Sequence, residues 1–363
     1  MSENDLKVLT RSGTSPEIIS LLKQTVFGTK GKVRYRQKHI AEGMKSQRNL
    51  EFIQILKRNR VLGTTGVATR QTSGLGDGLR SFYVRYLSVN NPFRKKEKKR
   101  GSKLNRKKSR ANNHLKKMIG DQITNHFEQP VYDNGSKASF YAFVESENYN
   151  SKELCINLGF YPTRKISTVL FSRFSPKKSP KVSIAEHQEE QRILKQLSSF
   201  YKTHSYYFED RLFEVGSYYI AKHKGEVVAG IRCKPVNWEI VEVPGLSGFL
   251  MQKVLPYLPF TNRLFNPNNL VFLAFDYAWG KTQAVLNLME HCCSESEINL
   301  GMFWGDLEST LISELKKSGQ LGFLYKLNGE VTAEVMQRFI NMDNNEQKEL
   351  LQKPVFVSAL DMT

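Results

Sequence analysis

Acidic, amide, hydroxyl and thiol side chains follow one another closely in the first half of the chain, and these residue types can move protons or bind polar groups. Glu145 and Glu147 come after an apolar run, followed by Asn148, Ser151 and Cys155. A carboxylate can take a proton, and a thiol, with an ordinary pKa of about 8.5, can give one up. The two glutamates can also be simple surface charges, and the cysteine can be a small buried apolar residue.

The surrounding pattern predicts the elements that position these residues. The apolar run at 140–144 has β character, and a short helix is expected after Asn148, continuing through Leu154. Gly159 supplies the tight exit that a helix C-terminus favours. Phe160 then opens two further β-prone runs. The local order is therefore strand, short helix and strand.

This order resembles the closing half of a GNAT-superfamily acyltransferase domain. The family pattern is an Asn, a small residue three positions on, an aliphatic residue beside a Tyr, and then Leu-Gly-Phe. The matching residues are Asn148, Ser151, Leu154 and Leu158-Gly159-Phe160. Cys155 stands where the family usually has Tyr. A generic strand-helix-strand unit is the alternative.

The resemblance implies roles for the residues singled out above. Cys155 takes the place of the acid that protonates the departing thiolate, and Glu145, at the end of the fifth strand, is the candidate base for the amine. The same comparison places Asn148 and Ser151 among the cofactor-binding residues. No His lies in a triad-like arrangement, and no metal site is expected.

The family binds acyl-CoA where its fourth and fifth strands splay apart, with the fourth strand pairing with the pantetheine. The strongly β-prone run at 82–89 takes the place of the fourth strand. By resemblance, Leu87, Ser88, Val89 and Arg94 are cofactor-binding residues.

The family's glycine-rich phosphate turn is not intact in this chain. One alignment keeps a single glycine, Gly101, among lysines, and the other puts Lys107, Arg110 and Asn112 in the signature. Helix N-termini bind anions, and added Lys and Arg can hold phosphate groups. The same departure is also consistent with a loss of CoA binding.

Charge is spread unevenly over the 363 residues. Residues 1–178 contain 36 Lys and Arg against 13 Asp and Glu, whereas residues 179–363 contain 18 against 22. Thirteen basic residues fall in 94–117 alone, with one acid, Glu97. Such density indicates an anionic partner or a solvated loop.

Two other features limit the class of protein. Four cysteines without paired zinc spacing predict a reduced, cytoplasmic protein. No apolar run is long enough to span a membrane, and no membrane partner is expected.

After a proline-containing linker the pattern starts again. A hairpin at 218–233 is followed by a buried-type strand at 270–275, a helix, a strand at 298–304 and a second Leu-Gly-Phe. The fold class expected is therefore α/β (α+β), with two GNAT-like domains, each a mixed β-sheet flanked by helices. The predicted boundaries are a basic domain at 1–174, a linker at 175–182 and a second, degenerate domain at 183–363.

Several features of the second copy stay open. Residues 277–281 take the place of its phosphate turn, 323–327 and 355–360 are predicted as strands, and 331–341 fits a helix or a strand. The three tryptophans either line a pocket or belong to the core, and they are Trp238, Trp279 and Trp304. A helix is expected at 246–258.

The leading functional hypothesis is an N-acyltransferase that moves an acetyl or other acyl group from acyl-CoA to a primary amine. The acceptor is open, and an acidic acceptor is one option. One rival is a Fem-type transferase that uses aminoacyl-tRNA. The other is a non-catalytic protein that binds nucleic acid or another acidic partner through 94–117. In that case nearby aromatic residues would stack on bases, namely Phe82, Tyr83, Tyr86 and Phe93.

Overall fold

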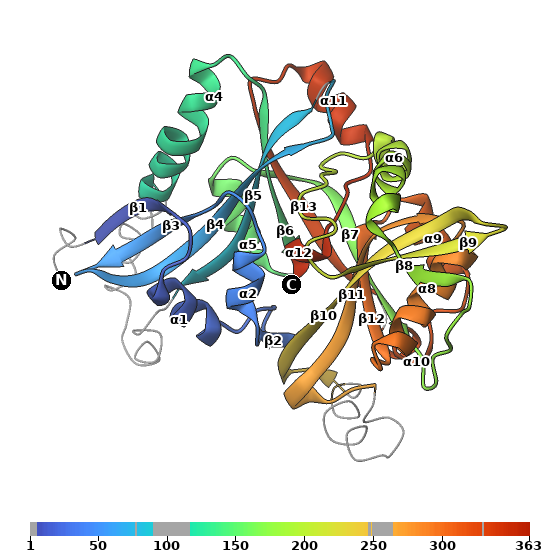
Figure 1. Cartoon of the computed structure of the whole chain (residues 1–363). Coiled ribbons are helices and arrows are strands. Elements are labelled where there is room, and N and C mark those ends of the chain that lie inside the picture. The colour runs from blue at the N-terminus through green and yellow to red at the C-terminus, as the bar shows by residue number, and fades with distance from the viewer. Residues whose placement is uncertain (1–5, 77, 90–116, 246–247, 249–263, 329) are drawn as a thin grey trace.

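The computed structural model describes residues 6–76, 78–89, 117–245, 248, 264–328 and 330–363. The strands of this described part are β1 (Leu6–Ser12), β2 (Arg34–Gln37), β3 (Leu50–Lys57), β4 (Arg60–Thr72), β5 (Leu79–Val89), β6 (Ala138–Glu145), β7 (Tyr161–Ser172), β8 (Val182–Ile184), β9 (Ser217–His223), β10 (Glu226–Glu242), β11 (Leu270–Gly280), β12 (Leu300–Asp306) and β13 (Val331–Ile340). They form one mixed sheet in the order β1-β3-β4-β5-β6-β13-β7-β12-β11-β10-β9-β8, with β2 added to β10 (Figure 1).

Helices cover both faces of this sheet. The α-helices are α1 (Pro16–Gln24), α2 (Ile40–Lys45), α4 (Gln129–Asp133), α5 (Tyr149–Asn157), α6 (Glu190–Phe200), α8 (Thr282–Glu295), α9 (Thr310–Lys317), α10 (Phe323–Asn328), α11 (Asn344–Gln352) and α12 (Ala359–Met362). The helix that ends in α4 is helical from residue 117 and contains a π-helical segment, η3 (Ile123–Glu128). Short 3-10 turns occur at η4 (His187–Glu189), η5 (Tyr201–Thr203) and η8 (Pro267–Asn269).

The two faces of the first half have separate cores. Residues of α1 and α2 pack with Phe52, Tyr83 and Tyr141. Residues of the 117–133 helix and of α5 pack with Phe82 and Phe140 on the opposite face. This division follows from the strands, because successive side chains of a strand point to opposite faces.

The two halves exchange strands in the middle of the sheet. β13, from near the C-terminal end of the chain, pairs antiparallel with both β6 and β7. β7, from the first half, pairs in turn with β12. The predicted fold class, a mixed sheet flanked by helices, is confirmed. The boundary at 175–182 stays a prediction, and the strands of the two halves form one continuous sheet.

Several predicted elements differ from the observed ones. Residues 323–327 are helical in α10, with Leu324 buried and Phe323 exposed; a short apolar run does not by itself distinguish helix from strand. Residues 355–358 form no strand apart from an isolated bridge of Val355 to Ser205, and residues 359–360 belong to α12. Residues 277–280 belong to β11 and not to a phosphate turn. The open segment 331–341 is a strand, β13.

The sequence did not indicate β2, α2 or α11, which are short or largely polar. The helix expected at 246–258 lies outside the described residues, apart from residue 248. No helix of the described part is long and apolar enough to cross a membrane.

Candidate active site

The parallel strands β5 and β6 separate at one end. Residues 80–83 are in register with residues 138–141, and the pairing stops there, although β5 continues to Val89 and β6 to Glu145. Beyond this point β5 remains paired with β4, and β6 with β13. The sheet therefore opens between its two central strands.

A β-bulge lies on β5 at the opening. Thr64 pairs with Ser88 and Gly66 pairs with Arg85, so two residues of β5 stand opposite one residue of β4. The first of these, Tyr86, has a φ of 55°, which is uncommon for a residue with a side chain. The bulge leaves the backbone of Tyr86 without a register partner in β4, and bulges of this kind are frequent beside active sites.

A cavity of about 390 Å³ passes through this opening. Its lining falls into two groups that belong to the cores on opposite faces of the sheet. The α5 compartment is lined by Ile53, Ile55, Val67, Val84, Ile119, Ile123, Ala142, Val144, Cys155, Leu158 and Phe160. The β10 chamber is lined by Phe143, Leu170, Trp238, Ile240, Leu270, Leu300, Met302, Trp304 and Leu324.

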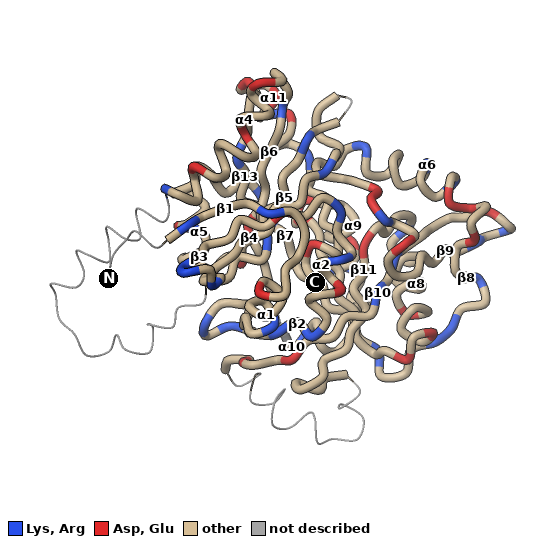
Figure 2. Tube along the Cα trace, turned by 60° about the vertical axis from the view of Figure 1, so that its left-hand side comes forward, with Lys and Arg blue, Asp and Glu red and all other residues tan. Residues whose placement is uncertain are grey.

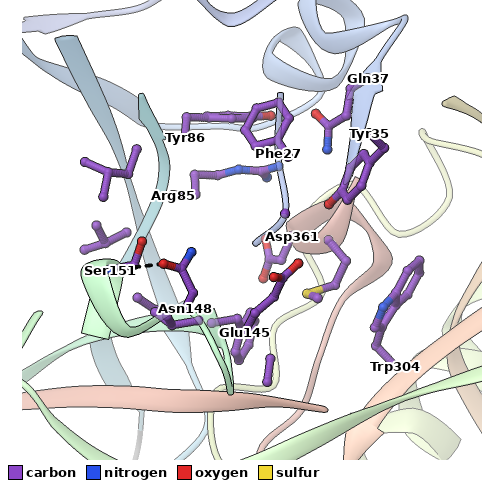
Figure 3. Close-up of a pocket in the computed structure, with 18 of the residues that line it drawn as sticks. Phe27, Tyr35, Gln37, Arg85, Tyr86, Glu145, Asn148, Ser151, Trp304 and Asp361 are labelled. Carbon is purple, nitrogen blue, oxygen red and sulfur yellow. Dashed lines mark hydrogen bonds between the residues drawn. The ribbon is translucent and has the colours of Figure 1, made fainter. Parts of the chain in front are cut away.

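The start of α5 faces the cavity. The Asn148 side chain accepts a hydrogen bond from the backbone N–H of Ser151 at 3.1 Å, which is a helix N-cap (Figure 3). Both residues line the cavity. Gly159, with a φ of 81°, turns the chain out of the helix as predicted. The Asn-led motif thus builds one wall of the cavity.

Cys155 also lines the cavity, one turn further along α5. Burial raises the pKa of its thiol to about 11. The thiol is therefore protonated at neutral pH, so it can donate a proton and is a poor nucleophile.

Glu145 lies at the end of β6, on the face opposite Cys155. Its Oε2 accepts hydrogen bonds from the backbone N–H of Thr29 at 2.9 Å and from the Thr29 hydroxyl at 2.5 Å. Its side chain points into the cavity between α5 and the wall that carries Trp304 (Figure 3). Glu147, by contrast, is exposed and pairs with Lys32 at 2.9 Å. Of the two candidate carboxylates, only Glu145 belongs to the cavity.

A second carboxylate at the cavity, Asp361, is committed to a buried ion pair. It accepts two hydrogen bonds from Arg70, at 2.8 and 2.6 Å, and both side chains are almost fully buried. Burial alone would lower the pKa of Arg70, but the adjacent Asp361 charge raises it. Arg85 donates to the backbone carbonyl oxygens of Leu360 and Thr363, at 2.6 and 2.9 Å. These contacts hold the segment 355–363 in the centre of the molecule.

The second half contains the same opening, but its own chain fills it. β11 and β12 pair only at residues 273–275 and 301–303, and β11 has the matching bulge, with Tyr277 at a φ of 48°. Asp276 there accepts from Arg232 at 2.7 and 2.5 Å and from the Ala359 N–H at 2.7 Å. Phe356 packs against Tyr277 with ring centroids 4.9 Å apart. The opening in the second half is therefore occupied by residues 356–359 of the same chain.

The predicted donor residues have different outcomes. Leu87 lines the cavity, whereas Ser88 is buried and hydrogen-bonded to Thr25 at 2.6 Å, and Val89 is 58% exposed and outside the cavity lining. The other predicted residues, Arg94, Lys107, Arg110 and Asn112, lie outside the described part of the chain.

Some cavity residues were missed by the sequence analysis. Tyr35 and Gln37 come from β2, a four-residue polar strand with no periodic signal. Of the three tryptophans, Trp238 and Trp304 line the cavity. Trp279 is a buried core residue, and its indole N–H donates to the Tyr218 hydroxyl at 2.9 Å.

Base stacking on the aromatic residues of β5 is not possible in this structure. Phe82, Tyr83 and Tyr86 are at most 5% exposed, and Phe93 is outside the described residues. Figure 2 shows Lys and Arg interspersed with Asp and Glu over the described part. Within the same ranges, no group of three or more His, Cys, Asp or Glu is placed to hold a metal ion.

Comparison of the fold with solved structures finds acyltransferases. Saccharomyces cerevisiae N-myristoyltransferase with bound myristoyl-CoA matches with a TM-score of 0.58 and 8% identity, over 98% of this chain and 90% of the yeast chain. A second structure of that enzyme, also with myristoyl-CoA, matches with a TM-score of 0.58 and 8% identity over 98% and 86%. A GCN5-related N-acetyltransferase from Sphaerobacter thermophilus matches with a TM-score of 0.40 and 10% identity over 79% and 80%.

No protein-family model matches the sequence, and no curated protein does. The likeness is therefore one of fold. It confirms the predicted fold class, a mixed α/β fold that is similar to the fold of the yeast N-myristoyltransferase.

Proposed function

We propose that the protein is an N-acyltransferase that moves an acyl group from acyl-CoA to a primary amine. One observation carries this proposal. A cavity crosses the sheet where two parallel strands separate beside a β-bulge, with a capped helix on one side and a carboxylate on the other. That arrangement can hold a thioester in the opening and bring an amine to it from the opposite face.

The donor enters through the α5 compartment. Its pantetheine arm lies between β5 and β6, in the part of the sheet where these two strands no longer pair with each other. Tyr86 and Leu87 stand opposite the single residue Thr65 at the bulge, and a backbone N–H that a bulge leaves without a ladder partner can stabilise the oxygen anion formed during attack. The matched yeast structures hold myristoyl-CoA, which supports acyl-CoA as the donor class.

Glu145 and Cys155 are placed at the cavity to take part in the proton transfers. Glu145 takes a proton from the incoming ammonium, and the free amine attacks the thioester carbonyl carbon. The carbon–sulfur bond then breaks, the thiolate leaves as CoA, and the remaining extra proton of the attacking nitrogen passes to that sulfur or to solvent, which leaves a neutral amide. Cys155 can donate a proton to that sulfur, but a thiolate is already a stable leaving group near neutral pH.

The lining supports an acyl group longer than acetyl. The α5 compartment is built almost entirely from aliphatic side chains, including Ile53, Ile55 and Val67. Burial of apolar surface favours an alkyl chain there by about 0.8 kcal/mol per methylene.

The proposal is tested with purified protein and acetyl-, octanoyl- and myristoyl-CoA, by mass spectrometry of the product on a panel of primary amines. Amine-dependent release of CoA with an N-acyl product is the expected result, with longer acyl chains favoured. Absence of binding to every acyl-CoA at millimolar concentration would refute the proposal. Transfer from aminoacyl-tRNA in place of acyl-CoA would instead favour the Fem-type alternative.

A further inference from the structure

The β10 chamber is an apolar space with no assigned occupant. Most of its side chains come from β10, β11 and β12 of the second half, including Trp238, Leu270, Met302 and Trp304. These residues belong to a different core from the α5 compartment and lie across the sheet from it. The chamber is thus continuous with the proposed thioester position but separate from the donor's entrance.

The chamber has rigid aromatic walls. Trp238 stacks on Tyr35 with ring centroids 3.8 Å apart and an interplanar angle of 12°. Trp238 also meets Phe272 edge-on at 4.8 Å, and Phe272 meets Trp304 at 6.4 Å. Walls that are already packed lose little conformational entropy when a ligand binds.

Two buried polar atoms at the edge of the chamber have no protein partner. They are the indole N–H of Trp238, a residue only 7% exposed, and the side-chain oxygen of Gln37. Both residues line the cavity, and they face each other across the β2–β10 pairing. A buried donor or acceptor without a partner is costly, which indicates that a polar group of a ligand completes this edge.

The position of Glu145 indicates which end of the bound molecule lies at the opening between β5 and β6. Its carboxylate lies on the face of the sheet to which the chamber belongs and beside the opening to the donor. A primary amine is an ammonium ion at neutral pH, so its charged end is drawn to Glu145. The rest of the molecule then extends between β10, β11 and β12.

We infer that the acceptor is an amine carried on an alkyl chain that also bears a hydrogen-bonding group, bound with the amine at Glu145, the chain in the β10 chamber and that group at Gln37 and Trp238. This inference rests on the proposed function, because it assigns the second substrate of the same site. A small polar amine would leave the chamber unfilled, and a protein lysine offers only a short methylene stem before its polar backbone.

Binding of n-alkylamines to the full chain, measured by calorimetry without any donor, tests the inference. Butylamine, hexylamine and octylamine are compared. Each added methylene is expected to tighten binding about fourfold, because it moves from water into an apolar space. Octanol is the matched neutral ligand, and it is expected to bind more weakly than octylamine because it carries no charge for Glu145.

Two matched variants separate the compartments. Met302→Gln places a polar group in the β10 chamber, and Ile119→Gln does so in the α5 compartment; the two residues are similarly buried, at 8% and 9% exposure. Octylamine affinity is expected to fall at least tenfold in the first variant and to change less than twofold in the second. The wild-type chain-length series needs no variant and decides the question if Met302→Gln fails to fold.

Two results would overturn the inference: affinity independent of alkylamine length, or displacement of octylamine by myristoyl-CoA but not by CoA. The second result would place the donor's acyl chain in the chamber. If either result is found and the protein still transfers acyl groups to small amines, the proposed function stands. Only this assignment of the acceptor is then removed.

Discussion

Replacement of Glu145 by Gln should lower the rate of transfer to an alkylamine about a thousandfold at pH 7.5. An amine with a pKa near 10.4 is only about 0.1% unprotonated at that pH, and without a base the enzyme depends on this fraction. The loss corresponds to about 4 kcal/mol of transition-state stabilisation. A Gln oxygen can still accept the two bonds from Thr29, so the local structure is expected to persist.

The pH dependence makes this prediction specific. The ratio of wild-type to variant kcat/KM should fall about tenfold for each pH unit between 7.5 and 10, because free amine becomes more abundant. Glu147→Gln is the matched control: it removes a carboxylate two residues away that is exposed and paired with Lys32. It should leave the rate within about twofold. A loss below tenfold for Glu145→Gln, or a ratio that does not change with pH, would refute the role of Glu145 as the base.

Three other predictions follow from contacts and pKa shifts. Cys155→Ala should cost less than about tenfold in kcat/KM, and the thiol should react slowly with iodoacetamide at pH 7, since burial raises its pKa to about 11; a thousandfold loss with intact folding would contradict this. Asp361→Asn should destabilise the protein by about 3–5 kcal/mol in denaturant titration, because it leaves the Arg70 charge buried without its partner; a loss under 1 kcal/mol would show that the pair is not structural. Burial lowers the pKa of His204 to about 4, so the unfolded chain binds its proton first as pH falls below 6.5, and stability should drop by about 3 kcal/mol down to pH 4; His204→Gln should flatten this slope, and an unchanged slope would assign it to other groups.

The fold was largely predictable from local patterns. The hairpin at 218–233 and the Asn148-led helix with its Gly159 exit were found because each is set by a few neighbouring residues. The exchange of β7 and β13 between the halves could not be predicted in the same way, because it depends on pairing between strands more than 120 residues apart.

The site was only partly predictable for a related reason. Glu145, Leu87 and the α5 residues were found because they follow strong strands or match a motif. Ser88 and Val89 were assigned to the cofactor on strand position alone, and the bulge at Tyr86 changed which side chains of β5 face the cavity. The tryptophans of the β10 chamber are remote in sequence, and no local signal separates a cavity wall from a core.

Hydrogen–deuterium exchange with a non-hydrolysable myristoyl-CoA analogue tests most directly whether the donor binds between β5 and β6. The account predicts slower exchange of backbone amides in residues 84–89 and 148–158. Residues 276–280, at the filled opening of the second half, should be unchanged. Protection at 276–280 in place of 84–89, or no change at either opening while the analogue is bound, would contradict the account.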